Sequence, residues 1–377
     1  MRYVFIVQGE GRGHLTQAMS MERLLRENGH AVVGVLAGKS PARKLPSFFS
    51  SAVSVPVETF ESFNFVPSAS NRKASMVKTG LYNIFHIASF LPSIRFIKRR
   101  LQELKPDVVV NFYDILGTVG YARSGLKAPM VCLGHQFLFL HRDFKFPRRG
   151  YEDRFPLNMF TRMIGWRAAK ILALSFRKME DDSGRRIKVV PPLLRPEVLS
   201  LRHADGTDDP LVRDGGYIHG YMLNAGFSGD ILDWHARHPD VGLHFFWDRV
   251  EEAPVKVVDD KLSFHYLDDE EFLRRMAGCH AYASTAGFES ISEAMYLGKP
   301  LLMVPVHVEQ KCNAFDATQG FRFNPAARQD IRPAVSAETF DLDKLMAFAD
   351  REFVPDSDFP AWARAADAIF LRELTDF

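Results

Sequence analysis

The sequence predicts an α/β protein of two Rossmann-like domains, and three observations lead to this prediction. A chain of 377 residues is too long for one hydrophobic core. Short runs rich in Val and Ile alternate with helix-like stretches, as in a parallel sheet that helices cover on both faces. The charge also divides, because residues 1–190 carry 30 Lys and Arg against 14 Asp and Glu, whereas residues 191–377 carry 18 against 32.

This division of charge gives the halves net charges of +16 and −14, within a formal total of +2. Two halves of opposite sign predict two domains with different partners. The alternative is that the opposite charges help the halves dock on each other. Nucleic acid is not expected as a partner, because no recognised binding motif accompanies the basic half.

The N-terminal domain is predicted over residues 1–190. In open parallel sheets, ligands bind beyond the carboxyl ends of the strands. Asp114, His135 and Gln136 each follow such an end, so we expect them at this edge. The predicted strands are Tyr3–Val7, Ala31–Leu36, Asp107–Phe112 and Met130–Leu133, with a helix over Leu15–Glu27.

A linker is predicted over residues 191–210, where three prolines and a polar stretch interrupt the pattern. A C-terminal domain over residues 211–356 follows, and an amphipathic helix over 359–374 within the closing segment 357–377 is expected to pack back on the N-terminal domain. The strands predicted in the second domain are 215–223, Leu243–Trp247, Leu262–Tyr266, Ala281–Ala283 and Leu301–Val304.

The three cysteines, Cys132, Cys279 and Cys312, lie far apart without metal-ligand spacing. No stretch of about 20 uninterrupted apolar residues exists that could span a bilayer. We therefore expect a cytoplasmic protein without a structural metal. Asp356-Ser357-Asp358 imitates a metal-binding motif, but we interpret it as a chance match in a connecting segment.

A glycine-rich turn, Ser284-Thr285-Ala286-Gly287, precedes a helix predicted from Phe288 to Leu297, with Gly298 and Pro300 at its end. A helix N-terminus presents free N–H groups and a partial positive charge, which suit a phosphate. Glu293, one turn along, could accept hydrogen bonds from sugar hydroxyls. Strand, glycine turn and helix alone are a weak signal, since every doubly wound sheet contains several.

The longer stretch from 283 to 314 is more specific, and it resembles the nucleotide-sugar signature of the UDP-glycosyltransferase superfamily. This superfamily of family 1 and family 28 type enzymes includes the lipid-linked N-acetylglucosaminyltransferase of peptidoglycan synthesis. The resemblance implies the GT-B fold, in which two Rossmann-like domains face each other across a cleft. It is carried by Gly287, Ser290, Glu293-Ala294, Gly298-Lys299-Pro300, Pro305, Glu309-Gln310 and Asn313-Ala314.

The resemblance also implies roles for residues that would bind a nucleotide-sugar donor, most simply a UDP-sugar. Gly287 and Ser290 would bind the diphosphate, and Glu293 the ribose hydroxyls. Thr285 stands where many members have His or Arg, which leaves open how the diphosphate is neutralised. The remaining donor residues would be Leu267 at the uracil, Ala225 and Gly226 in a second phosphate-side turn, and Glu309 and Gln310 at the transferred sugar.

The opening loop, GEGRGHLTQA from residue 9, resembles the loop of this family that faces the acceptor. Its glycines, including Gly11 and Gly13, allow positive φ and close backbone approach to a ligand. His14 is the candidate base for the acceptor hydroxyl. In many members an Asp orients this histidine, and Asp114 is the candidate here; the alternative is that Asp114 caps the next helix.

Alternative roles are open for His14 and His135, and the sequence also predicts the stereochemistry of the reaction. His14 could instead be a helix-start residue bonded to its loop, and His135 could be a second base, although with Gln136 it is better placed to line the acceptor side. Retaining members of the fold carry a second glutamate where this chain has Thr285, so an inverting displacement is favoured. That reaction requires neither a cofactor nor a metal.

The acceptor is a hydroxyl compound, for which we expect a lipid or a glycan. Residues 81–105 and 142–167 mix aromatic and basic side chains, as segments on an anionic bilayer do. The alternative for 81–97 is a core helix with a basic C-terminal end. Two other functions are also open: a nucleotide-sugar epimerase of the same fold, against which the loop Gly9–His14 and the segment Glu309–Ala314 argue, and a non-catalytic nucleotide-sugar binder.

Overall fold

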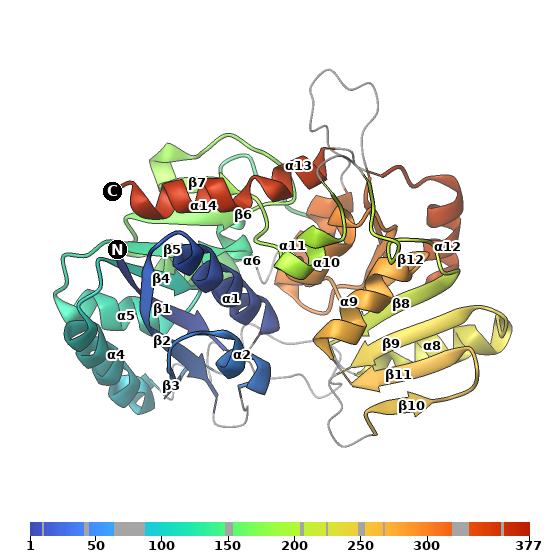
Figure 1. Cartoon of the computed structure of the whole chain (residues 1–377), viewed down its shortest axis with the longest axis horizontal. Helices are drawn as coiled ribbons and strands as arrows, with labels where there is room; N and C mark the ends of the chain where they lie inside the picture. Colours follow the sequence, from blue (N-terminus) through green and yellow to red (C-terminus); the bar gives the residue numbers. More distant parts are fainter. Residues whose placement is uncertain are drawn as a thin grey trace. The chain divides into compact units, whose positions relative to one another are not determined.

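Two sheets of mainly parallel strands, with helices packed on their faces, form the frame of the protein in a computed structural model (Figure 1). The structure describes residues 1–9, 11–40, 45–63, 87–147, 154–203, 207–223, 225–247, 253–266, 268–318, 332–355 and 358–377. One unit comprises Met1–Val66, Ser75–Leu193 and Trp362–Phe377, and the other contains Leu194–Ala361. The prediction of an α/β fold with two Rossmann-like parts is confirmed.

The first sheet has seven parallel strands in the order β3-β2-β1-β4-β5-β6-β7. Its interior strand β1 is buried along Tyr3–Val7, as a strand covered on both faces must be. The strands are β1 Arg2–Gln8, β2 Ala31–Lys39, β3 Val57–Glu61, β4 Val108–Phe112, β5 Met130–Gly134, β6 Lys170–Leu174 and β7 Ile187–Val190.

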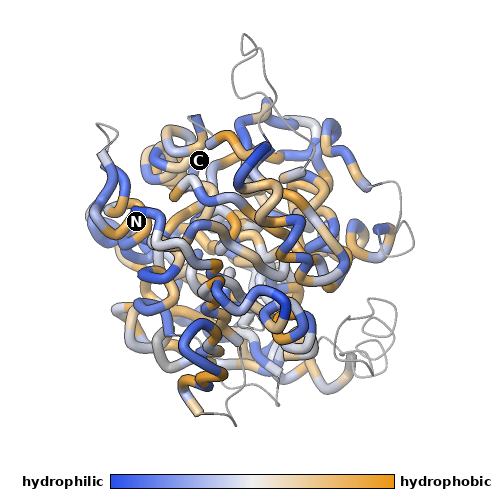
Figure 2. Tube along the Cα trace, turned by 90° about the vertical axis from the view of Figure 1, so that its right-hand side faces the viewer, coloured by the Kyte–Doolittle hydropathy of each residue, from blue (hydrophilic) through white to orange (hydrophobic). Residues whose placement is uncertain are grey.

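The helices α1, α4 and α6 of this unit are amphipathic. Hydrophilic and hydrophobic residues are mixed along the chain trace in Figure 2. Helix α1 begins at Arg12, three residues earlier than predicted, so His14 is helical. Three 3-10 turns accompany the helices: η1 Ile87–Phe90, η2 His135–Leu140 and η4 Ser183–Arg185. The helices are α1 Arg12–Glu27, α2 Ser47–Ala52, α4 Leu91–Leu104, α5 Ile115–Ser124, α6 Arg154–Ile164 and α14 Ala366–Thr375.

The second sheet has the order β10-β11-β9-β8-β12-β13-β14, and among its strands β10 alone is antiparallel to its neighbour. Its strands are β8 Tyr217–Met222, β9 Gly242–Trp247, β10 Val255–Val257, β11 Leu262–Tyr266, β12 Ala281–Ser284, β13 Leu301–Met303 and β14 Ala334–Ser336. Its helices are α7 Pro196–Ser200, the 3-10 turn η5 Ala225–Phe227, α8 Ser228–Arg237, α9 Asp269–Gly278, α10 Phe288–Tyr296, α11 Val308–Thr318, α12 Leu342–Arg351 and α13 Phe359–Arg364.

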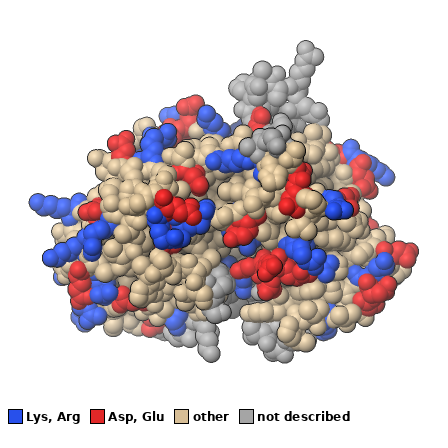
Figure 3. All heavy atoms as spheres, viewed as in Figure 1, with Lys and Arg blue, Asp and Glu red and all other residues tan. Residues whose placement is uncertain are grey.

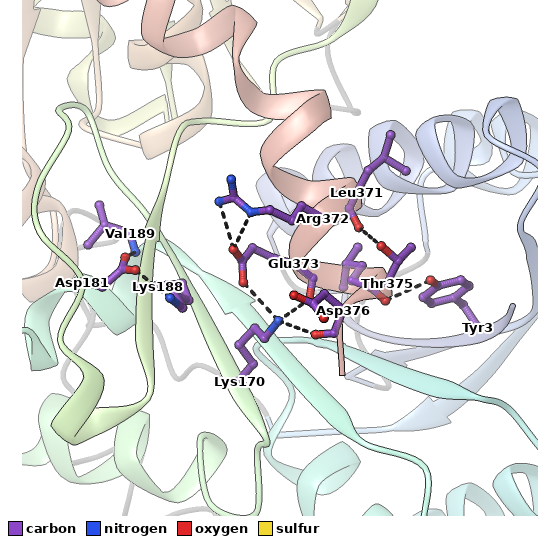
Figure 4. Close-up of polar contacts among 11 residues, drawn as sticks. Tyr3, Lys170, Asp181, Lys188, Val189, Leu371, Arg372, Glu373, Thr375 and Asp376 are labelled. Carbon is purple, nitrogen blue, oxygen red and sulfur yellow. Dashed lines mark hydrogen bonds and ion pairs between the residues drawn. The ribbon is translucent and has the colours of Figure 1, made fainter.

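The closing segment forms two helices, α13 and α14, where the sequence predicts one. Helix α14 is fastened to the first sheet at β1 and β6, and the Tyr3 hydroxyl donates to the Leu374 carbonyl at 3.0 Å. Lys170 binds the carbonyls of Glu373 (2.8 Å) and Asp376 (3.1 Å) and pairs with the Glu373 carboxylate (Figure 4). The last residues of the chain therefore belong structurally to the first unit.

The stretch predicted as a linker, 191–210, has structure of its own. Leu193, Leu194 and Val198 are buried, and Val198 belongs to the short helix α7. The division between the units falls at Leu193 and Leu194. The first part of the segment, 191–194, is buried, whereas the described residues near its end, Thr207, Asp208 and Pro210, are exposed.

Cys132, Cys279 and Cys312 are all buried free thiols. On the face drawn in Figure 3, Lys and Arg side chains are interspersed with Asp and Glu and do not form a patch of one sign. None of the helices in the described part of the chain has the length and apolar character needed to cross a bilayer.

Candidate functional site

His14 lies in the first turn of α1, directly after the loop that follows β1. The described glycines of this loop do not adopt positive φ, contrary to expectation; Gly11, the N-cap, has φ of −114°. Gly9 is required for another reason. A Cβ there would lie 2.5 Å from the Gly38 carbonyl oxygen, to which the Gly9 N–H donates at 2.7 Å. Close approach of two backbones therefore explains Gly9.

The His14 ring has a polar partner at each nitrogen. Its Nδ1 lies 3.3 Å from Oε1 of Gln17, one turn along α1, and its Nε2 lies 3.4 Å from Nε2 of Gln136. The ring of Tyr113 stacks on it at 5.7 Å with an interplanar angle of 21°. Segments after β1, β4 and β5 thus meet at this histidine.

Desolvation by this environment lowers the pKa of His14 to about 4, although the hydrogen bond to Gln17 opposes the shift. His14 is therefore neutral near pH 7. A neutral imidazole with a free lone pair can accept a proton, as a general base must.

Asp114 does not hydrogen-bond to His14, and the predicted dyad is not formed. Its Oδ1 accepts from the Gly117 N–H at 2.7 Å and caps α5, while its Oδ2 accepts from the Ser62 hydroxyl at 2.7 Å. The carboxyl is fully buried, and burial raises its pKa to about 6 despite these hydrogen bonds. The hydrogen bond from Gly117 makes Asp114 a helix cap, which is the alternative role given in the sequence analysis.

His135 and Gln136 follow β5 but point to different surroundings. His135 is buried, its Nδ1 donates to the Leu174 carbonyl at 2.7 Å, and its ring packs near Phe139 and Phe176. Gln136 reaches His14. An acceptor-side role for both residues stays a prediction, and the contacts favour Gln136.

Apart from Leu267, the predicted donor residues in the second unit follow β8, β12 and β13, which are adjacent in the sheet. The Thr285 hydroxyl accepts from the Leu223 N–H at 3.2 Å, and the Asn313 amide donates to the Ala286 carbonyl at 3.0 Å. These bonds connect the turn after β12 to the segment after β8 and to α11. The three predicted donor segments are thus held together at one edge of the sheet.

Helix α10 begins after Gly287, whose φ and ψ are −71° and 144° and which supplies no side-chain cap. The first-turn N–H groups of a helix have no partners within the helix, so they are available to an anion. Ser290 is half-buried in this first turn. A phosphate site at this helix N-terminus stays a prediction.

Glu293 makes a bidentate ion pair with Arg195, a contact that the sequence did not suggest. Arg195 Nε lies 2.6 Å from Oε1 and Nη2 lies 3.0 Å from Oε2. The Glu293 side chain is 5% exposed and that of Arg195 is 16% exposed, so little water screens the pair. The carboxylate is consequently held in one orientation.

The other predicted donor residues have the following positions. Ala225 and Gly226 lie in η5, and the Ser228 hydroxyl donates to the Ala225 carbonyl at 2.9 Å. Glu309 is half-buried in the first turn of α11, whereas Gln310 is buried and its Oε1 accepts from the Val306 N–H at 2.9 Å. Leu267 lies outside the described residues, as do Asp356 and Ser357. No metal-binding group of His, Cys, Asp and Glu is found within the described ranges.

The sequence analysis identified neither Gln17 as a partner of His14 nor Arg195 as a partner of Glu293. Gln17 follows His14 by three positions, a spacing that brings side chains together on a helix, so a correct helix start would have indicated it. Arg195 and Glu293 are 98 positions apart, and no local pattern connects them.

Comparison with known proteins gives a consistent result. The profile of glycosyl transferase family 1 matches residues 1–334. Over 330 residues, 81% of this chain and 75% of the relative, the sequence is 23% identical to the UDP-N-acetylglucosamine--N-acetylmuramyl-(pentapeptide) pyrophosphoryl-undecaprenol N-acetylglucosamine transferase of Rhodospirillum centenum.

Solved structures share the fold over nearly the whole chain. The glycotransferase of kitacinnamycin aligns with a TM-score of 0.61 and 16% identity, covering 99% of both chains. Medicago truncatula UGT71G1 complexed with UDP-glucose gives 0.60 and 14%, covering 99% of this chain and 98% of its own. Acinetobacter baumannii MurG gives 0.55 and 16% over 100% of both chains. These likenesses show the GT-B fold.

Proposed function

Because the chain belongs to glycosyl transferase family 1, and is therefore a glycosyltransferase, we propose that it transfers a hexose from a UDP-sugar to an acceptor hydroxyl with inversion. The Rhodospirillum centenum relative is named for a UDP-N-acetylglucosamine donor, and UGT71G1 was solved with UDP-glucose. Both support a UDP-linked donor.

The observation that carries the donor proposal is the N-terminus of α10. Gly287 supplies no side-chain cap to α10, and the hydrogen bonds of Thr285 and Asn313 hold the turn in place. A diphosphate at this point would receive hydrogen bonds and a favourable helix dipole. Ser290 would add a hydroxyl, and Ala225 and Gly226 a second turn on the phosphate side.

Glu293 would bind the ribose hydroxyls while paired with Arg195. Each carboxylate oxygen can accept more than one hydrogen bond, so the ion pair does not prevent contact with a hydroxyl. Glu309 and Gln310 are proposed to contact the sugar, and Leu267 the uracil.

His14 is proposed as the base that removes the proton of the acceptor hydroxyl. Its neutral ring and its position after the carboxyl end of β1 support this role. The sugar would be attacked opposite the leaving diphosphate, which the α10 N-terminus would stabilise. Thr285 occupies the place of the second glutamate of retaining members and is bonded to Leu223, which supports inversion.

The first unit is proposed to meet an anionic membrane that carries a lipid-linked acceptor. Helix α6 and the turn that follows it support this: Phe155, Met159 and Met163 in the helix and Trp166 just beyond its end, spaced four, four and three apart, are 73%, 49%, 49% and 53% exposed. We call these four side chains the α6 stripe. Exposed Arg162 lies within the same segment. Apolar side chains beside a cation are typical of a surface that lies in a bilayer interface.

The test is a thermal-shift series with UDP-, GDP- and dTDP-sugars, followed by titration calorimetry of the best ligand. A ligand that binds only the native state raises the melting temperature with its concentration. We expect UDP-sugars to raise it most. If no nucleotide-sugar shifts the melting temperature at millimolar concentration, the donor proposal is wrong.

A further inference from the structure

We propose that Gln17, and not Asp114, is the residue that sets the tautomer and orientation of His14. The inference rests on the proposed function for its consequence in catalysis, but its structural part concerns the free protein alone. Gln17 would act through His14 and is a positioning residue.

The two amides around His14 require the same tautomer. An amide oxygen can only accept, so Gln17 Oε1 at 3.3 Å from Nδ1 places the ring proton on Nδ1. An amide nitrogen can only donate, so Gln136 Nε2 at 3.4 Å from the ring Nε2 faces a lone pair there. Nε2 is therefore the atom that would accept a proton.

Gln17 is well suited to hold the ring. It lies one turn from His14 on the same helix and is only 3% exposed. Tyr113 covers the ring face, and its hydroxyl is bonded to Thr161 at 2.7 Å. Tyr113 has a left-handed φ of 62°, and the Asn111 side chain accepts from the next backbone N–H at 2.8 Å. The stacking residue is thus itself anchored.

Asp114 is committed to other donors. Both of its oxygens are hydrogen-bonded, to Gly117 and to Ser62, in a fully buried position. Its Oδ2 also lies 2.5 Å from where a Cβ of Gly38 would stand, so that glycine is needed to admit the carboxylate. Turning Asp114 toward His14 would leave two buried donors without an acceptor.

Having an amide and not a carboxylate at Nδ1 affects the pKa of His14. A carboxylate at Nδ1 would stabilise the imidazolium form and raise the pKa of His14. A neutral amide orients the ring without adding charge, so His14 remains unprotonated well below pH 7. With a neutral orienting group, His14 can therefore act as a base over a wide pH range.

The test is histidine-selective ¹⁵N NMR of the full chain, with the His14 signals assigned by their loss in His14→Gln. At pH 7 we expect the Nδ1–H tautomer in the native protein. In Gln17→Met the tautomers should mix, and in Gln17→Glu the His14 pKa should rise by about one unit or more. Asp114→Asn should leave tautomer and pKa unchanged.

Ser62→Ala, which removes one partner of Asp114, is the second variant if Asp114→Asn does not fold; it should also leave the His14 signals unchanged. A changed tautomer in either variant, or an unchanged one in Gln17→Met, overturns the proposal. In a transfer assay, Gln17→Met should lose on the order of 10²-fold in kcat/KM. In Gln17→Glu, the apparent pKa of the acid limb of the pH–activity profile should rise by the same amount as the His14 pKa measured by NMR.

Activity separates this inference from the proposed function. If His14→Gln retains full transfer activity, His14 is not the base, and the NMR result still decides which residue orients the ring. If His14→Gln is inactive while Gln17→Met keeps the native tautomer and rate, the base proposal stands and the positioning proposal is wrong.

Discussion

Arg195 and Glu293 form a buried bidentate ion pair that joins the first residues of the second unit to helix α10. Arg195 follows the boundary at Leu193 and Leu194 and directly precedes α7. The residue proposed to bind the ribose is therefore oriented by the segment that enters its domain. Loss of either partner leaves an uncompensated buried charge.

Arg195→Met should destabilise the second unit by about 3–5 kcal/mol, because Glu293 would remain buried without its cation. The measurement is the midpoint of urea unfolding followed by circular dichroism. Arg237→Met is the matched control, since Arg237 and Asp343 are 62% and 53% exposed and should contribute less than about 1 kcal/mol. Equal losses in the two variants would contradict a special role for the buried pair.

Glu293→Gln should weaken binding of the UDP-sugar by about 10- to 100-fold, the value of a charge-assisted hydrogen bond of about 1.5–3 kcal/mol. Calorimetric titration measures the effect. Glu270→Gln, on the exposed face of the first turn of α9, is the control and should bind as the native protein does. Unchanged affinity in Glu293→Gln would remove Glu293 from the donor site.

His14→Gln should lower the rate of UDP release in the presence of acceptor by roughly 10²–10⁴-fold, the usual contribution of a general base. The dissociation constant of the donor should not change, because the donor is assigned to the second unit. A rate within a factor of about two of the native rate would assign the proton transfer to another group.

His219→Leu should make the protein less sensitive to acid. Desolvation lowers the pKa of fully buried His219 to about 3, below the 6.5 of the unfolded chain. The unfolded state therefore binds the proton first, and stability is complete above pH 6.5 and declines as the pH falls toward 3. The slope is about 1.4 kcal/mol per pH unit for one histidine.

The measurement compares urea midpoints at pH 7 and pH 4.5. The native protein should lose more stability between these values than His219→Leu does. His238→Gln is the control, because the His238 side chain is 38% exposed and pairs with Asp343 at the surface. An equal pH dependence in the native protein and His219→Leu would show that this histidine does not govern acid stability.

The α6 stripe should be needed for membrane binding. Replacing Phe155 and Trp166 together by Ser removes two exposed aromatic rings and should reduce binding to vesicles of phosphatidylglycerol and phosphatidylcholine at least about tenfold. Co-sedimentation measures the bound fraction. Leu232→Ser, which removes an apolar side chain that is 41% exposed in the second unit, is the control. If the double variant binds the vesicles as well as the native protein does, the α6 stripe is not needed for membrane binding.

Much of the fold could be predicted because the strands near the centre of each sheet are buried on both faces. The run Tyr3–Val7 is apolar throughout, and Val108–Phe112 is apolar except for Asn111, so both stand out in the sequence. The strands β3, β6, β7, β10 and β14 were missed, and of these β3, β7, β10 and β14 lie at the edges of their sheets. Only part of β3 and none of β10 is buried, so neither carries a continuous apolar pattern.

The sequence by itself determined the α/β class, the glycine turn and helix at Phe288, and the position of His14 after the first strand. These depend on neighbouring residues, since periodicity, turns and helix ends are local. The partners of the functional side chains were decided only by the tertiary structure. Asp114 turned to Ser62 and Gly117, and Glu293 received Arg195, because burial requires each charge to be satisfied by whatever donors the packing brings near. The Gly117 donor is local, and the sequence indicated it as a helix cap, but Ser62 and Arg195 come from distant parts of the chain, so their identity cannot be read from the local pattern.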